Sequence, residues 1–251
     1  MQNNDISNTI SPGSYQAVSF DVGYTLLGPV EEAQVVVRRF LAGHALDPSP
    51  EALAHAYERA ETTFFRMYQQ PLNDIWASDA GIRDFFEGYY VQLLGDLGLP
   101  DPDRSHARTI IAHYLEPQNW RVYPGVWETL AELRRRGYRI GIASDWGTDL
   151  RHILHSHGFT AHLDWAVISG GIGHAKPSPA FYNLVVKRAA VPAHRIVHIG
   201  DNYRADVLGA RTAGMDGMLI DWTGRVTAPL DVPVLHSLAQ LLELLPSLNN
   251  G

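Results

Sequence analysis

Five short runs of nearly continuous apolar residues lie along the chain and predict buried strands. A strand with one wet face would alternate apolar and polar residues, whereas these runs suit a parallel sheet covered by helices on both faces. Helical patterns over residues 149–158, 179–190 and 204–214 separate the last four runs, and another at 125–137 precedes the second. This alternation predicts an α/β fold with right-handed crossovers. The runs are AVSFDV (17–22), YRIGIAS (138–144), WAVIS (165–169), RIVHIG (195–200) and GMLID (217–221).

The stretch 30–119, between the first two runs, shows no strand pattern and contains four amphipathic helical patterns. It is too long for a crossover between neighbouring strands, so we expect a separate α-helical cap domain inserted after the first strand. The core then consists of residues 17–29 and 120–251, preceded by a polar leader, residues 1–16, that we expect to be disordered. The helical patterns of the cap are 31–44, 50–69, 82–98 and 104–115.

Composition narrows the classes of function. The chain has 251 residues and no cysteine, which excludes disulfides, thiol nucleophiles and cysteine-bound metals. Its net charge of −7 argues against a nucleic-acid partner, and the arginines at 134–136 lie at a predicted helix end, where cations suit the helix dipole. No window offers the ~20 apolar residues of a membrane helix, and the N-terminus lacks the pattern of a signal peptide. We therefore expect a cytoplasmic protein without a membrane partner.

Polar residues gather where the predicted strands end. Asp21 ends the first strand, and Ser144 and Asp145 end the second. Asp201 ends the fourth, with Asp206 five residues later, and Lys176, one of two lysines in the chain, precedes the helix that follows the third strand. Ligands of an open parallel sheet bind at the carboxyl ends of its strands. A single carboxylate there would suit a helix cap, but the set together suits a divalent metal, Mg²⁺, and a phosphate group.

These residues fall within four motifs: FDVGYTLL (20–27), IASD (142–145), KPSPAFY (176–182) and HIGDNYRADVLGARTAGM (198–215). In order and spacing the motifs resemble those of the haloacid dehalogenase-like hydrolase superfamily, and the resemblance extends from residue 17 to the C-terminus. The helical insertion is similar to the C1-type cap of that superfamily. Within it, the chain looks most like the phosphatase-like branch, which implies a Rossmann-like core acting on a small phosphorylated molecule.

The resemblance implies a role for each motif residue. Asp21 would be the nucleophile that forms a covalent aspartyl intermediate, with Lys176 paired to it and to the phosphoryl group. Ser144, Asp145 and Thr25 would belong to the phosphate-binding set. Mg²⁺ would be held by Asp21, by Asp201 and by the backbone carbonyl of Gly23, with Asp206 acting on the metal from behind.

Gly23 departs from the usual pattern of the superfamily, in which a second Asp at this position protonates the leaving group and then activates water. General acid–base catalysis is typically worth about 10²–10⁴-fold in rate, so we expect slow turnover of ordinary phosphate monoesters. Acyl or aryl phosphates, which need little protonation, would be affected least, and Gly23→Asp is expected to raise turnover of alkyl phosphates. Tyr24 is expected to pack under the cap rather than to act as the acid. Other candidates for a replacement acid are Arg66, Asn73, Asp74 and His174.

Two other functions, a haloacid dehalogenase and a binding protein, remain open at this stage, and a third, a phosphonatase, is all but excluded. A haloacid dehalogenase also lacks the second Asp, but it uses no Mg²⁺, and Asp201 with Asp206 would concentrate negative charge needlessly. A phosphonatase needs a cap lysine, and residues 30–119 contain none. A binding protein with a catalytically weak or inactive Mg²⁺ and phosphate site would have no use for a reactive Asp21. Periodicity does not separate a monomer from a homodimer.

Overall fold

The computed structural model describes residues 15–68, 75–228 and 230–248. Most of the predicted leader, residues 1–14, lies outside the described residues. The expected boundary at residue 16 is wrong, because Tyr15 is buried and its hydroxyl donates a hydrogen bond of 2.6 Å to Asp216 Oδ2. The backbone N–H of Gln16 donates to the carbonyl of Arg195, so the chain joins the core two residues earlier than expected.

A parallel sheet of six strands forms the centre of the core, in the order β5-β4-β1-β6-β7-β8. The five predicted strands are confirmed, because each carries the buried apolar residues that a sheet covered on both faces needs. The sixth strand was not predicted, since two residues are too few to form a pattern. The strands are β1 (Ala17–Phe20), β4 (Arg139–Ser144), β5 (Trp165–Ile168), β6 (Ile196–Gly200), β7 (Asp216–Ile220) and β8 (Val234–Leu235).

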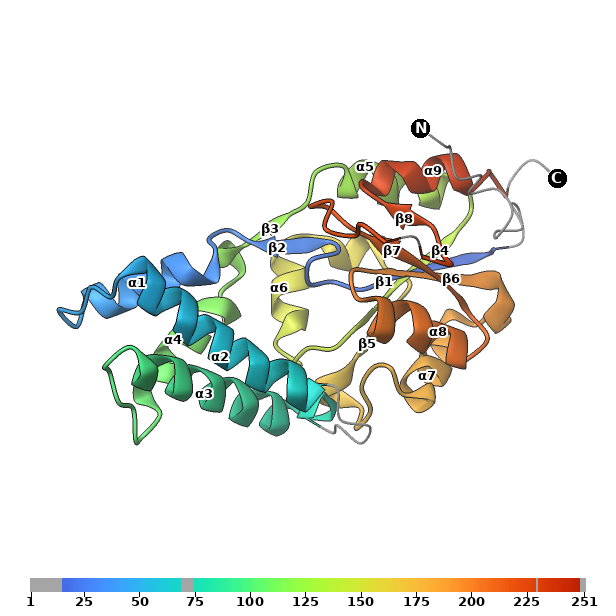
Figure 1. Cartoon of the computed structure of the whole chain (residues 1–251). Helices are drawn as coiled ribbons and strands as arrows, with labels where there is room; N and C mark the ends of the chain where they lie inside the picture. Colours follow the sequence, from blue (N-terminus) through green and yellow to red (C-terminus); the bar gives the residue numbers. More distant parts are fainter. Residues whose placement is uncertain (1–14, 69–74, 229, 249–251) are drawn as a thin grey trace.

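Helices cover both faces of this sheet, as expected for a Rossmann-like fold (Figure 1). Residues of α5, α6 and α9 share one hydrophobic cluster with β1 and β4, and residues of α7 and α8 share another. The helices are α5 (Val126–Arg135), α6 (Leu150–Ser156), α7 (Pro179–Ala189), α8 (Gly209–Thr212) and α9 (Leu241–Leu244), with a π-helical segment over Tyr203–Leu208.

The four cap helices lie together at one end of the sheet (Figure 1). They have their own hydrophobic cluster, which includes Val37, Leu41 and Leu93. An antiparallel pair of strands, β2 (Leu27–Pro29) and β3 (Trp120–Val122), frames the insertion where the chain enters and leaves it. No strand was expected between β1 and β4, and these two were missed because each has only three residues. The cap helices are α1 (Ala33–Ala42), α2 (Pro50–Tyr68), α3 (Asp79–Asp96) and α4 (Ser105–Leu115).

Within the described residues, no helix has both the length and the apolar character needed to cross a membrane.

Candidate active site

Asp21 follows β1 directly and lies at the carboxyl end of the sheet. Its backbone N–H donates to the carbonyl of Ile199 at 2.8 Å, which extends the pairing of β1 with β6 by one residue. The chain then turns sharply, because the N–H groups of Leu26 and Leu27 both donate to the carbonyl of Val22 at 2.9 Å. This turn leaves the Asp21 side chain, 11% exposed, at the rim of the sheet.

Lys176 joins two of the predicted carboxylates. Its Nζ donates to Asp21 Oδ1 at 2.7 Å and to Asp206 Oδ1 at 2.6 Å, and its side chain is buried. Burial alone would lower the pKa of Lys176, but Asp206 and Asp21 outweigh it and raise that pKa well above its usual value. The ammonium group is therefore charged and holds the two carboxylates in place.

Both carboxylate oxygens of Asp206 accept hydrogen bonds. Besides the ammonium, Oδ1 accepts a bond of 3.2 Å from His198 Nε2, and Oδ2 accepts the N–H of Asn202 at 2.9 Å. Burial raises the pKa of Asp206, yet the charge of Lys176 and the bond from His198 prevail and hold it below its usual value. Asp206 is thus ionised, and its hydrogen bond with Lys176 orients the ammonium group towards Asp21.

His198 and Ser19 form a second layer behind Asp206 that the sequence reasoning missed. His198 is completely buried, which lowers its pKa and keeps the imidazole neutral. Since Nε2 faces a carboxylate, it carries the proton and donates, while Nδ1 accepts from the Ser19 hydroxyl at 3.0 Å. The two residues are partners in the register of β1 and β6. The signal in the sequence that could have revealed them is a polar residue within each of two apolar runs, Ser19 in 17–22 and His198 in 195–200.

Three carboxylates meet at the strand ends. One oxygen from each of Asp21, Asp201 and Asp206 lies within 4.8 Å of the others. Burial, partly offset by Lys176, raises the pKa of Asp21; desolvation and then the charges of Asp21 and Asp206 raise the pKa of Asp201. One ammonium does not balance three carboxylates, and an all-oxygen donor set is the kind that Mg²⁺ prefers. The residues present therefore fit a divalent cation.

The remaining predicted residues take different places. Ser144 ends β4 and is 1% exposed. Asp145 Oδ1 accepts the backbone N–H of Lys176 at 3.0 Å, and burial raises the pKa of Asp145 to about 7. Thr25 is completely buried, and its hydroxyl has no hydrogen-bond partner among the described residues. Its assignment to the phosphate-binding set stays a prediction, as do the roles of Ser144 and Asp145.

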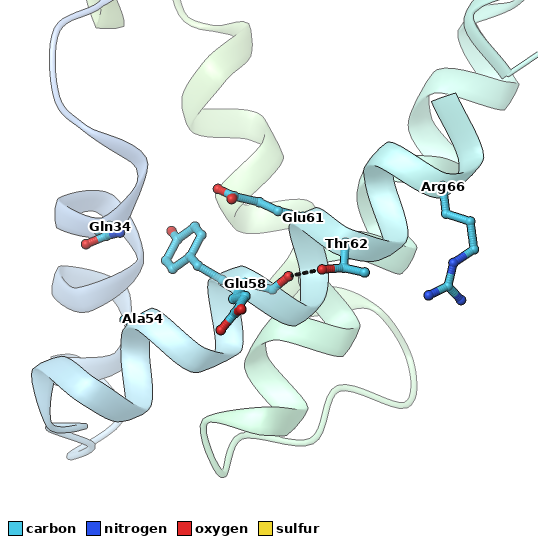
Figure 2. Close-up of a pocket in the computed structure, with 7 residues that line it drawn as sticks. Gln34, Ala54, Glu58, Glu61, Thr62 and Arg66 are labelled. Carbon is cyan, nitrogen blue, oxygen red and sulfur yellow. Dashed lines mark hydrogen bonds between the residues drawn. The ribbon is translucent and has the colours of Figure 1, made fainter. Parts of the chain in front are cut away.

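The candidates for a replacement acid are dispersed. Asn73 and Asp74 lie outside the described residues, and His174 is exposed. Tyr24 does not pack under the cap as expected; its side chain is 55% exposed and its φ is 55°, a left-handed conformation that is uncommon for a residue with a side chain. Arg66 is exposed on α2 and helps to line a hollow of about 560 Å³ between α1 and α2 (Figure 2). Gln34, Ala54, Tyr57, Glu58, Glu61 and Thr62 complete this lining, which includes none of the residues around Asp21.

Fold and site together define a class: a Rossmann-like α/β enzyme with an inserted helical cap and a cluster of carboxylates and one lysine at the strand ends. The family model described as haloacid dehalogenase-like hydrolase matches residues 15–214. The chain therefore belongs to the haloacid dehalogenase-like hydrolases, and it is a hydrolase.

Curated relatives and solved structures agree with this assignment. The chain is 29% identical to haloacid dehalogenase-like hydrolase domain-containing protein 3 of Danio rerio, over 87% of this chain and 93% of the relative. It is 30% identical to phosphoserine phosphatase of Thermus thermophilus, over 69% and 68%. Among solved structures, magnesium-bound HAD-hydrolase YfnB of Bacillus subtilis superimposes with a TM-score of 0.73 at 16% identity, covering 92% of this chain and 98% of that one, which shows a shared fold.

Proposed function

We propose that this hydrolase is a Mg²⁺-dependent phosphatase that acts on a small phosphorylated molecule through an aspartyl-phosphate intermediate at Asp21. The observation that carries the proposal is the buried ammonium of Lys176 between Asp21 and Asp206, beside a third carboxylate, Asp201. A carboxylate that can act as a nucleophile, a fixed positive charge and carboxylate oxygens that can hold a cation therefore lie at one edge of the sheet, which supports the proposal.

Lys176 orients the nucleophile. Asp21 Oδ1 accepts a hydrogen bond from the ammonium group of Lys176, and we assign the attack on phosphorus to the other carboxylate oxygen, Oδ2. That oxygen bonds to phosphorus while the bond from phosphorus to the leaving oxygen breaks, and the leaving group keeps the electron pair. Water then attacks the phosphorus of the intermediate and the bond to Asp21 breaks, so that the sum is a phosphate monoester plus water giving an alcohol or phenol plus inorganic phosphate.

The other site residues have supporting roles in this proposal. Ser144 lies at the end of the neighbouring strand, where its hydroxyl suits a phosphoryl oxygen. Asp145 holds the backbone of Lys176 through its Oδ1. Asp21, Asp201 and the carbonyl of Gly23 would hold Mg²⁺, with Asp206 behind them. The cation, when bound, neutralises negative charge on the carboxylates and on the phosphoryl oxygens.

Gly23 leaves the reaction without a carboxylic acid beside the leaving group. The leaving oxygen therefore departs as an anion and takes its proton from water, which favours leaving groups that form stable anions. Solved dehalogenase structures share the fold at 22–24% identity. The acidic cluster favours phosphate chemistry over halide displacement, because uncompensated carboxylates gain from a cation.

Hydrolysis of p-nitrophenyl phosphate with and without Mg²⁺, by the wild type and by Asp21→Asn, tests the proposal. We expect Mg²⁺-dependent turnover that is lost in Asp21→Asn and kept in Asp47→Asn, a control at a carboxylate that is 83% exposed. A phosphoryl group trapped on the peptide that contains Asp21 would support the intermediate. Chloride release from 2-chloropropionate without Mg²⁺, in place of phosphate release, would contradict the proposal and favour the dehalogenase.

A further inference from the structure

The indole of Trp146 occupies the space next to Gly23. A Cβ atom built on Gly23 would lie 3.2 Å from Cζ3 of this indole and 3.8 Å from Cε3. The first distance is tighter than ordinary van der Waals contact, so a side chain at position 23 requires the ring to shift by a few tenths of an ångström. Gly23 and Trp146 are therefore a fitted pair: the glycine leaves room for the ring, and the ring fills the room in which a longer side chain would begin.

Trp146 is held in this position from three sides. Its backbone N–H donates to Ser169 Oγ at 3.1 Å, and its indole Nε1 donates to Asp149 Oδ2 at 3.2 Å. The ring also meets Trp120 edge to face, with centroids 4.7 Å apart. Trp120 in turn donates a hydrogen bond from Nε1 to the carbonyl of Tyr114 in α4, so the ring of Trp120 lies where the core meets the cap.

In the proposed reaction the leaving group would point into the same region. A carboxylate that attacks from the end of β1 displaces a leaving oxygen roughly in line with itself, and the leaving group therefore points away from the sheet towards the cap. Trp146 lies beside the residue two positions after Asp21, on this side. Tyr24, which follows Gly23, adds a second aromatic residue; it is 55% exposed and its backbone has a φ of 55°. A conformation of this kind is unfavourable for a residue with a side chain and persists where the surroundings hold it.

We propose that Trp146 is the residue that determines substrate specificity: its ring forms an aromatic wall for the leaving group, and the substrate class is aryl phosphates. This inference rests on the proposed phosphatase function and gives it a substrate class. A planar phenolic leaving group gains from the ring contact, and it departs as a phenolate that takes its proton from water. The pair also changes the expectation for Gly23→Asp, which should fail to raise turnover of alkyl phosphates while Trp146 is present.

Kinetics with phenyl phosphate and n-propyl phosphate test the aromatic wall. Aromatic contacts contribute about 0.5–1.5 kcal/mol, so the preference in kcat/KM for the phenyl ester should fall about 2- to 13-fold in Trp146→Ala. Trp146→Leu keeps an apolar side chain without the ring and should show the same fall, which covers the case in which the alanine variant does not fold. Trp146→Phe should keep most of the preference, and so should Trp127→Phe, a control whose ring packs on Phe159 instead. An active Trp146→Leu enzyme with an unchanged preference would overturn the inference.

Two further measurements separate this inference from the proposed function. If no variant hydrolyses either ester, the phosphatase proposal fails, and calorimetric binding of phenylphosphonate and n-propylphosphonate with Mg²⁺ decides about the wall. A preference for the phenyl compound that Trp146→Leu abolishes supports the wall, and equal binding overturns it.

In an active enzyme, Gly23→Asp should raise propyl phosphate turnover at least tenfold in the Trp146→Ala background and not in the wild type. A rise of equal size in both backgrounds would contradict the fitted pair.

Discussion

On the sheet side of Asp21 the polar groups are buried and paired with one another, whereas on the cap side the neighbouring side chains are aromatic and partly exposed. Lys176, Asp206, His198 and Ser19 form a continuous hydrogen-bonded series behind the nucleophile. In front of it, Gly23 removes a side chain and Trp146 takes the space. The groups expected to carry out the chemistry are therefore held by strand residues and by the buried turn and helix that follow the strands, while the groups expected to select the substrate lie on loops between core and cap.

Removal of the buried ammonium should have the largest effect on the sheet side. In Lys176→Ala, Asp21 and Asp206 lose the charge between them, and breaking a buried ion pair from one side typically costs about 3–5 kcal/mol of unfolding free energy. Any hydrolysis should fall at least about 10²-fold. Urea unfolding and phosphate release measure the two effects. Lys187→Ala changes the other lysine, which is exposed, and should lower neither the unfolding free energy nor the rate of hydrolysis. Equal stability of the two variants would mean that the pairing does not hold this region together.

Replacement of the imidazole tests the layer behind Asp206. His198→Ala leaves the Ser19 hydroxyl and one bond of Asp206 unpaired in a completely buried site, and it opens a cavity. We expect a loss of about 3 kcal/mol of unfolding free energy. Because His198 acts through Asp206, kcat should fall more than KM rises. His194→Ala, at an exposed position, is the matched control. If KM rose and kcat stayed constant, His198 would contribute to substrate binding instead.

Asp145 lies between the two sides and makes stability depend on pH. Its pKa is raised to about 7 in the folded chain from an ordinary value of 3.8, so the folded state binds the extra proton between these values. Unfolding free energy therefore falls as pH rises from about 4 through 7. The full shift in pKa corresponds to about 4 kcal/mol, of which we expect on the order of 2 kcal/mol because Asp145 is partly exposed to solvent. Asp145→Asn keeps an oxygen for the N–H of Lys176 but does not titrate. With chelator present, urea unfolding at pH 5 and pH 8 should show a smaller pH dependence in this variant, and an unchanged one would contradict the assignment.

The two sides also differ in how far sequence reasoning reaches. Asp21, Ser144 and Asp201 were predicted to meet because each lies at the carboxyl end of a strand, and parallel strands end at one edge. The Gly23–Trp146 contact joins the loops after two different strands, and no local periodicity encodes that distance. His198 and Ser19 were detectable as polar residues in apolar runs, but only the register of β1 with β6 makes them partners. Likewise, β2, β3 and β8 are too short for a pattern to reveal.

The smallest effect expected concerns the contact between core and cap. Asp79, the first residue of α3, accepts the backbone N–H of Thr148 at 2.8 Å and its hydroxyl at 2.6 Å. Thr148 follows Trp146 by two residues, so Asp79→Ala should loosen the cap against the loop that carries the indole. The loss of unfolding free energy should be about 1 kcal/mol, since the contact is only partly buried. KM for phenyl phosphate should rise severalfold while kcat changes little, because the sheet side of Asp21 is untouched. Asp84→Ala alters a carboxylate of the same helix that is 76% exposed and should leave KM unchanged. A fall in kcat at constant KM in Asp79→Ala would show that the two sides of Asp21 are coupled rather than separate.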